Sequence, residues 1–147
     1  MNATELEGNW TYRSFINDTG QVGNDAQKAL ALIFGEGDLT ISPKGPSIFH
    51  AVLDFGGGAA MDLYGEVVPG GGVNPAALII TGTGRENTST AKWVYQYKGY
   101  VVPQWAEGVK QVPGIVGTVI RTIPHASSTP GVESPAGVVA SFMMLRK

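Results

Sequence analysis

Short runs in which apolar and polar side chains alternate dominate this chain, and they predict β-strands. In the run at 48–55, Phe49 and Leu53 lie on one face while His50 and Asp54 lie on the other. Successive side chains of a strand point to opposite faces of a sheet, so one face of each run is expected to be buried. Eight strands are expected, at 8–16, 37–42, 48–55, 59–68, 76–84, 92–101, 115–123 and 136–146.

One segment departs from the β pattern. Asn24 and Asp25 are favourable N-cap residues, and the strong helix formers of 26–32 follow them. Gly35 is a suitable residue to end a helix. We therefore expect one short helix after the first strand.

The short links between the eight strands favour an up-and-down meander. Closure into a barrel removes the exposed edges that an open sheet of this length would have. Eight strands also enclose an interior wide enough for side chains or for one small ligand. The expected fold class is all-β, an eight-stranded antiparallel up-and-down barrel, with a β-sandwich of the same strands as the alternative. At 147 residues the chain is expected to form a single β-barrel domain, 1–147.

The apolar face of each strand is expected to point into the barrel. Fully burying one large apolar side chain stabilises a fold by roughly 1.5–3 kcal/mol, so this orientation is hard to reverse. The predicted interior residues are Trp10, Tyr12, Phe49, Leu53, Phe55, Met61, Leu63, Trp93, Tyr95 and Tyr97. The predicted outward residues are His50, Asp54, Asp62, Glu66, Lys92 and Lys98.

Composition excludes several classes of protein. The chain has no cysteine, which rules out disulfides and thiolate metal sites, and it has 2 histidines, so neither a metal nor a cofactor is expected. Its net charge is −2 and it has no long run of Lys or Arg, so no nucleic-acid partner is expected. No stretch approaches the roughly 18 apolar residues of a membrane-spanning helix, and the N-terminus lacks the pattern of a signal peptide. We therefore expect a soluble, cytoplasmic protein with no membrane partner.

A short motif opens the first strand. Gly8-Asn9-Trp10 is similar to the Gly-x-Trp motif of the lipocalins and their calycin relatives, the avidins included. The resemblance implies a barrel that holds a ligand and is closed at one end by this Trp. It also implies that an Arg from a late strand packs across the Trp ring by a cation–π contact, with Arg121 and Arg146 as candidates.

The aromatic side chains of the predicted interior are the candidate ligand-binding residues. Such a set suits a small hydrophobic or aromatic molecule, with Tyr hydroxyls to orient it. The alternative is that these rings only fill the core. The candidate residues are Trp10, Tyr12, Phe49, Trp93, Tyr95 and Tyr97.

Two other functional classes remain open. One is a cofactor-independent enzyme, such as an isomerase or cyclase, that uses Tyr97, Arg121 and His125 in the same cavity. The other is a structural subunit with a fully plugged barrel. An interior Arg121 or His125 within reach of a Tyr hydroxyl would favour the enzyme. If both are solvated, as a surface-loop histidine would be, simple binding is favoured.

The last two strands are apolar on both faces. At 115–123 and 136–146 an inward face alone cannot account for all the apolar side chains. A large exposed apolar patch on a soluble protein often marks an interface. We therefore expect a homo-oligomer that packs through these two strands.

Overall fold

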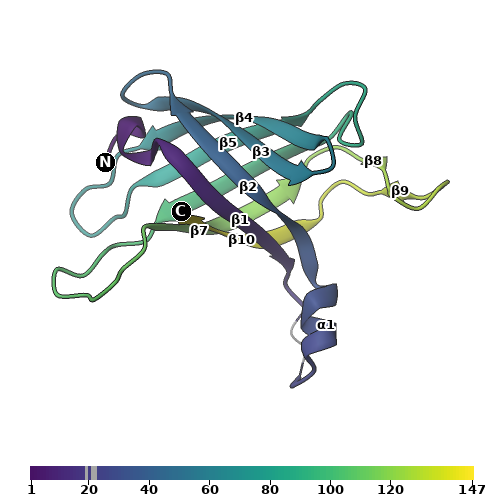
Figure 1. The fold of residues 1–147 in the computed structure, drawn as a ribbon, viewed down its shortest axis with the longest axis horizontal. Coiled ribbons are helices and arrows are strands. Elements are labelled where there is room, and N and C mark those ends of the chain that lie inside the picture. The colour runs from purple at the N-terminus through teal and green to yellow at the C-terminus, as the bar shows by residue number, and fades with distance from the viewer. Residues whose placement is uncertain (19, 21–22) are drawn as a thin grey trace.

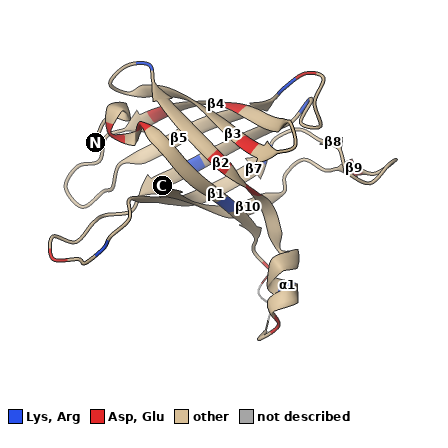
Figure 2. Cartoon of the chain, in the orientation of Figure 1, with Lys and Arg blue, Asp and Glu red and all other residues tan. Residues whose placement is uncertain are grey.

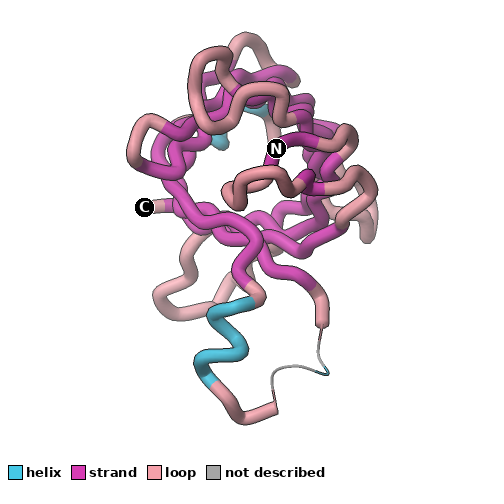
Figure 3. The backbone as a smooth tube through the Cα atoms, turned by 90° about the vertical axis from the view of Figure 1, so that its right-hand side faces the viewer, coloured by secondary structure: helices cyan, strands magenta, loops and turns pink. Residues whose placement is uncertain are grey.

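Eight antiparallel strands close into a barrel in the computed structural model, which describes residues 1–18, 20 and 23–147 (Figures 1 and 3). Each strand pairs with the next in sequence, and the last pairs with the first, so the up-and-down barrel and its all-β class are confirmed. The β-sandwich alternative is wrong. The strands of the wall are β1 (Gly8–Ile16), β2 (Ile33–Pro43), β3 (Ile48–Gly56), β4 (Ala59–Val68), β5 (Ala77–Gly84), β6 (Val94–Val101), β7 (Gly114–Arg121) and β10 (Val139–Arg146).

The smaller elements lie at the two ends of the barrel. The 3-10 helix η1 (Ala3–Leu6) precedes β1, and the helix α1 (Ala26–Ala31) lies between β1 and β2. The two-residue strands β8 (His125–Ala126) and β9 (Glu133–Ser134) pair within the connection from β7 to β10. Figure 3 looks along the barrel and shows α1 projecting away from the ring of strands.

The short helix after the first strand is confirmed, with Asp25 as its N-cap. The Asp25 carboxylate accepts hydrogen bonds from the backbone N–H groups of Gln27 and Lys28. The prediction that Gly35 ends this helix is wrong, because β2 already begins at Ile33 and Gly35 lies within it. The cause is pairing with β1, since a continuous ladder of hydrogen bonds across the barrel outweighs local helix propensity.

One end of the barrel is closed by Trp10, which is 2% exposed. Its indole Nε1–H donates to the carbonyl of Leu6 in η1 at 2.9 Å. The Arg146 guanidinium lies across the indole ring, 5.5 Å from its centre, and donates to the carbonyl oxygens of Glu5 and Glu7. Of the two candidate arginines, Arg146 therefore makes the contact that the lipocalin resemblance implies. We call this the closed end.

The interior side chains follow the predicted alternation. Of the ten predicted interior residues, all are buried except Phe55 and Trp93, which are partly buried. Inward-facing glycines make room for rings that reach across the lumen. A Cβ on Gly65 would lie 2.1 Å from Cζ of Phe49, and one on Gly99 would lie 3.0 Å from Cζ of Phe142. The missing side chains thus allow a barrel of this width to hold so many aromatic rings.

Of the predicted outward residues, Lys92 is exposed in the turn before β6, and the other five lie on the outer wall, where acidic and basic side chains are interspersed (Figure 2). On β7 and β10 the outward side chains are mostly apolar, and Val116, Val139, Met143 and Leu145 are each 40–48% exposed. None of the helices in the described residues is long and apolar enough to cross a membrane.

Candidate functional site: a cavity at the open end

A cavity of about 370 Å³ lies at the end of the barrel opposite Trp10, which we call the open end. Aromatic rings form most of its apolar surface, and serines of the β7–β10 connection lie at its mouth. Its lining residues are Tyr12, Ser14, Ile33, Phe34, Gly35, Phe55, Met61, Trp93, Tyr95, Tyr97, Val119, Arg121, His125, Ala126, Ser127, Ser128 and Ser134.

Three polar side chains of the cavity form a hydrogen-bonded group centred on Tyr95. The Arg121 Nε–H donates to the Tyr95 hydroxyl oxygen at 3.1 Å. The same hydroxyl lies 2.8 Å from Nε2 of His125. All three residues are buried, with Arg121 8% and His125 6% exposed.

Strand register brings Tyr95 and Arg121 together. The two residues are direct partners in the β6–β7 ladder, and both follow the inward alternation of their strands. His125 arrives from the β7–β10 connection, where it pairs with Ser134 across β8 and β9. Arg121 also holds this connection, because its Nη1–H donates to the carbonyl of Pro135 at 2.9 Å.

The hydrogen-bond partners of His125 assign its neutral tautomer. Its Nδ1 lies 2.8 Å from the backbone carbonyl of Ala126, and a carbonyl oxygen can only accept. The proton of the neutral ring is therefore on Nδ1, and Nε2 accepts the hydroxyl proton of Tyr95. Tyr95 thus donates to His125 while it accepts from Arg121, so a proton leaving Tyr95 has both an acceptor and a neighbouring cation.

The tyrosines of the cavity are protonated at neutral pH, and burial moves the pKa of each hydroxyl further above it. Burial raises the pKa of Tyr95, although the hydrogen bond and the positive charge of Arg121 oppose the rise. Burial raises the pKa of Tyr12 to about 12, with interactions of the Ser14 and Tyr97 side chains partly offsetting it. The pKa of the fully buried Tyr97 hydroxyl is also raised well above its ordinary value by burial.

Arg121 brings a permanent positive charge to this cavity. Its guanidinium carbon lies 5.2 Å from the centre of the Phe34 ring and 5.8 Å from that of Tyr95, within the range of cation–π contacts. Across the part of the chain that the structure describes, no ion pair joins Arg121 to an Asp or Glu. No carboxylate is among the described residues that line the cavity either.

The predicted ligand-binding residues divide between two parts of the barrel. Tyr12, Trp93, Tyr95 and Tyr97 line the cavity. Trp10 is buried at the closed end, and the ring of Phe49 packs across Gly65 in the wall, so neither contributes to this lining. Of the predicted catalytic residues, Tyr97, Arg121 and His125 all line the cavity.

His125 was a catalytic candidate, and the alternative of a solvated surface-loop histidine is wrong, because β8 turns the ring onto Tyr95 and Trp93. Sequence reasoning missed two other residues of the site, Phe34 and Ser14. Phe34 was missed because β2 was expected to start only at Gly37. Ser14 shares the strand alternation of Trp10 and Tyr12, which could have placed it inside, and its hydroxyl donates to the carbonyl of Gly35.

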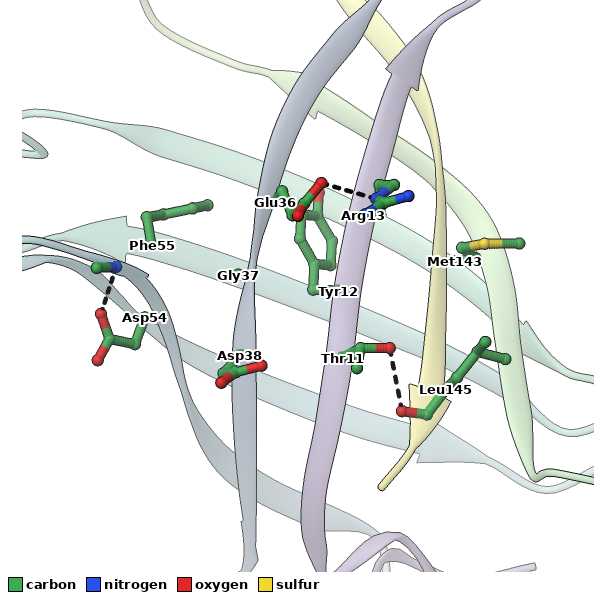
Figure 4. A pocket seen from close by; sticks show the side chains of 11 residues that line it. Thr11, Tyr12, Arg13, Glu36, Gly37, Asp38, Asp54, Phe55, Met143 and Leu145 are labelled. Carbon is green, nitrogen blue, oxygen red and sulfur yellow. Dashed lines mark hydrogen bonds and ion pairs between the residues drawn. The ribbon is translucent and has the colours of Figure 1, made fainter. Parts of the chain in front are cut away.

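A larger hollow of about 580 Å³ lies on the outer wall, beside β1 and β2 (Figure 4). Its charged side chains form ion pairs or are exposed to solvent. Arg13 pairs with Glu36 at 2.8 Å, and both side chains are about half exposed. The hollow is therefore a weaker candidate for small-molecule binding than the ring-lined cavity at the open end.

His50 lies on the outer wall and pairs across the strands with Asp62, at 3.4 Å, rather than along its own strand. Asp62 also accepts two hydrogen bonds from Arg85, and this bonding, more than the charge itself, lowers the pKa of the Asp62 carboxyl. Within residues 1–18, 20 and 23–147, no group of three His, Asp or Glu side chains is placed to hold a metal ion.

The site and fold define a closed, eight-stranded antiparallel β-barrel with an internal cavity, an architecture consistent with the calycin type. Comparisons with protein-family models, with curated proteins and with solved structures found no match to this chain.

Proposed function

We propose that this barrel binds a small hydrophobic or aromatic molecule in the cavity at its open end. The observation that carries the proposal is the asymmetry of the lumen. Trp10 and Arg146 close the lumen at one end, where a hollow of about 380 Å³ is lined mainly by the N-terminal segment and the β6–β7 connection. At the other end a cavity of about 370 Å³ is lined by the inward aromatic rings of the wall. Ligand sites are typically concave and mostly apolar, with a few polar groups that orient the ligand. A calycin-type relationship, which Gly8-Asn9-Trp10 suggests, is part of this proposal.

The cavity favours binding over a purely structural role. In a fully plugged barrel the inward side chains would interdigitate at both ends, as they do around Trp10. At the open end, small residues leave the space unfilled. A Cβ on Gly35 would lie 3.3 Å from Oγ of Ser14 and 3.5 Å from the Phe55 ring, so this glycine keeps the wall beside those two residues clear.

The second candidate function is a cofactor-independent enzyme, an isomerase or cyclase that acts by proton transfer. The observation that favours it is the contact of the Tyr95 hydroxyl with both Arg121 and His125. In such an enzyme Tyr95, once its hydroxyl proton has passed to His125, would remove a proton from the substrate as the phenolate and return it at another position. His125 Nε2 would accept the hydroxyl proton and Arg121 would stabilise the phenolate. Tyr95 therefore takes the role that the sequence assigned to Tyr97.

Binding is tested with a neutral dye whose emission rises in apolar surroundings. We expect saturable binding of about one dye per chain, as one cavity per barrel requires. Ala126→Trp places a large side chain at the mouth and should abolish the signal. Ala136→Trp is the matched control, because Ala136 is exposed in the same connection but does not line the cavity. A signal that survives Ala126→Trp would refute the proposed location.

Native mass spectrometry of freshly purified protein separates the binder from the enzyme. A simple binder should carry a ligand of the same mass in the wild type and in Tyr95→Phe. An enzyme should carry unconverted substrate in Tyr95→Phe, and therefore a ligand that differs from that of the wild type. An isomerisation leaves the mass unchanged, so the released ligands are also compared by chromatographic retention. Identical ligands by both criteria would refute the enzyme.

We also propose that the outward faces of β7 and β10 pack against a second copy of this chain. Val116 and Met143 are cross-strand partners, as are Ile120 and Val139, and the uncharged pair Thr118 and Ser141 lies between these two apolar pairs. This face carries no charged side chain at its outward positions. Two copies of such a face can therefore meet without repulsion between like charges.

A further inference from the structure

We infer that the ligand of the open-end cavity carries a carboxylate, which binds the guanidinium of Arg121 while the apolar part of the ligand packs on the aromatic rings. The inference rests on the proposed binding function and specifies its ligand class as small aromatic or unsaturated carboxylic acids.

The first argument is the unbalanced charge of Arg121. Burying a charged group is costly unless an opposite charge and hydrogen bonds compensate for it. Two arginines on the outer wall have such partners, because Arg13 pairs with Glu36 and Arg85 with Asp62. Arg121 is more buried than either, yet its partners in the described chain are neutral. A carboxylate in the cavity would supply the missing charge.

The second argument is the donor count of the guanidinium. Its Nε–H is taken by the Tyr95 hydroxyl and its Nη1 by the carbonyl of Pro135. The described residues provide no hydrogen bond to Nη2. They also contain no fully buried side-chain nitrogen or oxygen that lacks a partner, so Nη2 is accessible from the cavity or from solvent. A planar carboxylate is well matched to this group, because Arg binds carboxylates through charge-assisted hydrogen bonds.

The third argument is that the described lining contains no carboxylate or other anionic group that could neutralise Arg121 or repel a ligand carboxylate. Tyr12, Tyr95 and Tyr97 are neutral at the pH of the test, and burial raises the pKa of each hydroxyl further. The Tyr95 proton is directed to Nε2 of His125, so the Tyr95 oxygen does not compete with a ligand carboxylate as a counter-charge. A cationic ligand would be repelled by Arg121, and a neutral ligand would leave its charge unbalanced.

The rest of the lining fits the apolar part of such an acid. Trp93 lies edge-on to Phe55, with ring centres 6.0 Å apart, and edge-on to Tyr95 at 5.9 Å. Phe34 in turn contacts Tyr95 at 5.9 Å. These rings offer faces and edges to a planar, conjugated ligand within reach of Arg121.

The test uses three two-ring probes of nearly equal shape: 2-naphthoate, 2-naphthamide and 2-naphthylmethylammonium. Affinities for the full chain are measured by equilibrium dialysis at neutral pH. A hydrogen bond to a charged group corresponds to about 10- to 100-fold in affinity, so we expect naphthoate to bind tighter than naphthamide by this factor. The ammonium probe should bind more weakly than either.

Variants test whether Arg121 causes the preference for naphthoate. Arg121→Gln should reduce naphthoate affinity to that of naphthamide, whereas Arg121→Lys should keep part of the preference because it keeps the charge. Arg146→Gln is the matched control, since Arg146, like Arg121, lies over an aromatic ring and donates to a backbone carbonyl, but at the closed end. It should leave the ratio of the two affinities unchanged.

The outcomes separate the inference from the proposed function. Equal affinities of naphthoate and naphthamide for the wild type would overturn the carboxylate and leave the binding function intact. Binding of none of the three probes would overturn both. Should Arg121→Gln fail to fold, as judged by circular dichroism, the wild-type ratio and Arg121→Lys still decide the matter.

Discussion

The imidazole of His125 lies flat against the indole of Trp93, with ring centres 4.7 Å apart and planes 22° from parallel. This stack fixes the β7–β10 connection to the start of β6, at the mouth of the cavity. Together with the hydrogen bond to Tyr95, it makes His125 a structural part of the site whatever the ligand is.

Truncation of His125 should therefore destabilise the barrel. We expect His125→Ala to lower the free energy of unfolding by about 1–3 kcal/mol, because it removes the stack and leaves the Tyr95 hydroxyl without its acceptor. His125→Phe keeps a ring against Trp93 and should recover part of this loss. Denaturant unfolding measures both. His50→Ala is the control on the outer wall, and a loss for His125→Ala no larger than for His50→Ala would contradict the prediction.

Phe49 depends on the absence of a side chain at Gly65. Gly65→Ala places a methyl group 2.1 Å from Cζ of Phe49, and overpacking of this kind typically costs about 1–3 kcal/mol. Phe49→Leu shortens the side chain, so the double variant should lose less than the two single variants added together. Gly71→Ala, which meets nothing within 4 Å, is the control in thermal unfolding. Additive losses in the double variant would exclude the proposed contact.

The buried tyrosines predict how stability depends on alkaline pH. The pKa of Tyr12 is about 12 in the folded state against 10.0 for the unperturbed group. The unfolded chain therefore loses this proton first, so stability is full below pH about 10 and falls as pH rises toward about 12, by up to about 3 kcal/mol for two pKa units. Tyr12→Phe should flatten this fall in denaturant unfolding. If the free energies of unfolding of the two proteins fell in parallel as pH rises, Tyr12 would not be responsible for the loss of stability.

The closed end should tolerate change without effect on the cavity. Arg146→Gln removes the guanidinium from the Trp10 ring, and we expect a loss of about 0.5–1 kcal/mol from the cation–π contact, with a similar further loss from the carbonyl hydrogen bonds. Dye binding at the open end should not change. A large drop in dye affinity, with the fold intact, would mean that the two ends are coupled.

The proposed packing of β7 and β10 on a second copy predicts a charge-sensitive oligomer. Met143→Glu should convert the wild-type oligomer to a monomer in native mass spectrometry, because it buries a charge in an apolar interface. Ile79→Glu is the matched control, since Ile79 is 46% exposed on β5, away from this face. A monomeric wild type would refute the proposal outright.

The sequence predicted the site in part, and the particular failures have a physical cause. Tyr95 and Tyr97 alternate along β6, so their common face followed from the period of two, and Trp93 keeps this face although β6 begins only at Val94 rather than at Lys92. Arg121 shares the alternation of Ile115 and Val119, and this places it inside. His125 has no such neighbours, because it follows Pro124 in an irregular connection whose path no periodicity describes.

What the sequence by itself determined is local: the strands, the N-cap at Asp25 and the inward face of each strand follow from short-range sterics and from the burial of apolar side chains. Which residues meet was decided by the tertiary structure, because strand register and barrel closure join positions far apart in the chain. Only closure puts Arg146 over Trp10, and only the β6–β7 register sets Arg121 beside Tyr95. The tertiary structure also decided that one end of the lumen is closed and the other holds a cavity, because this depends on the combined volumes of side chains from all eight strands.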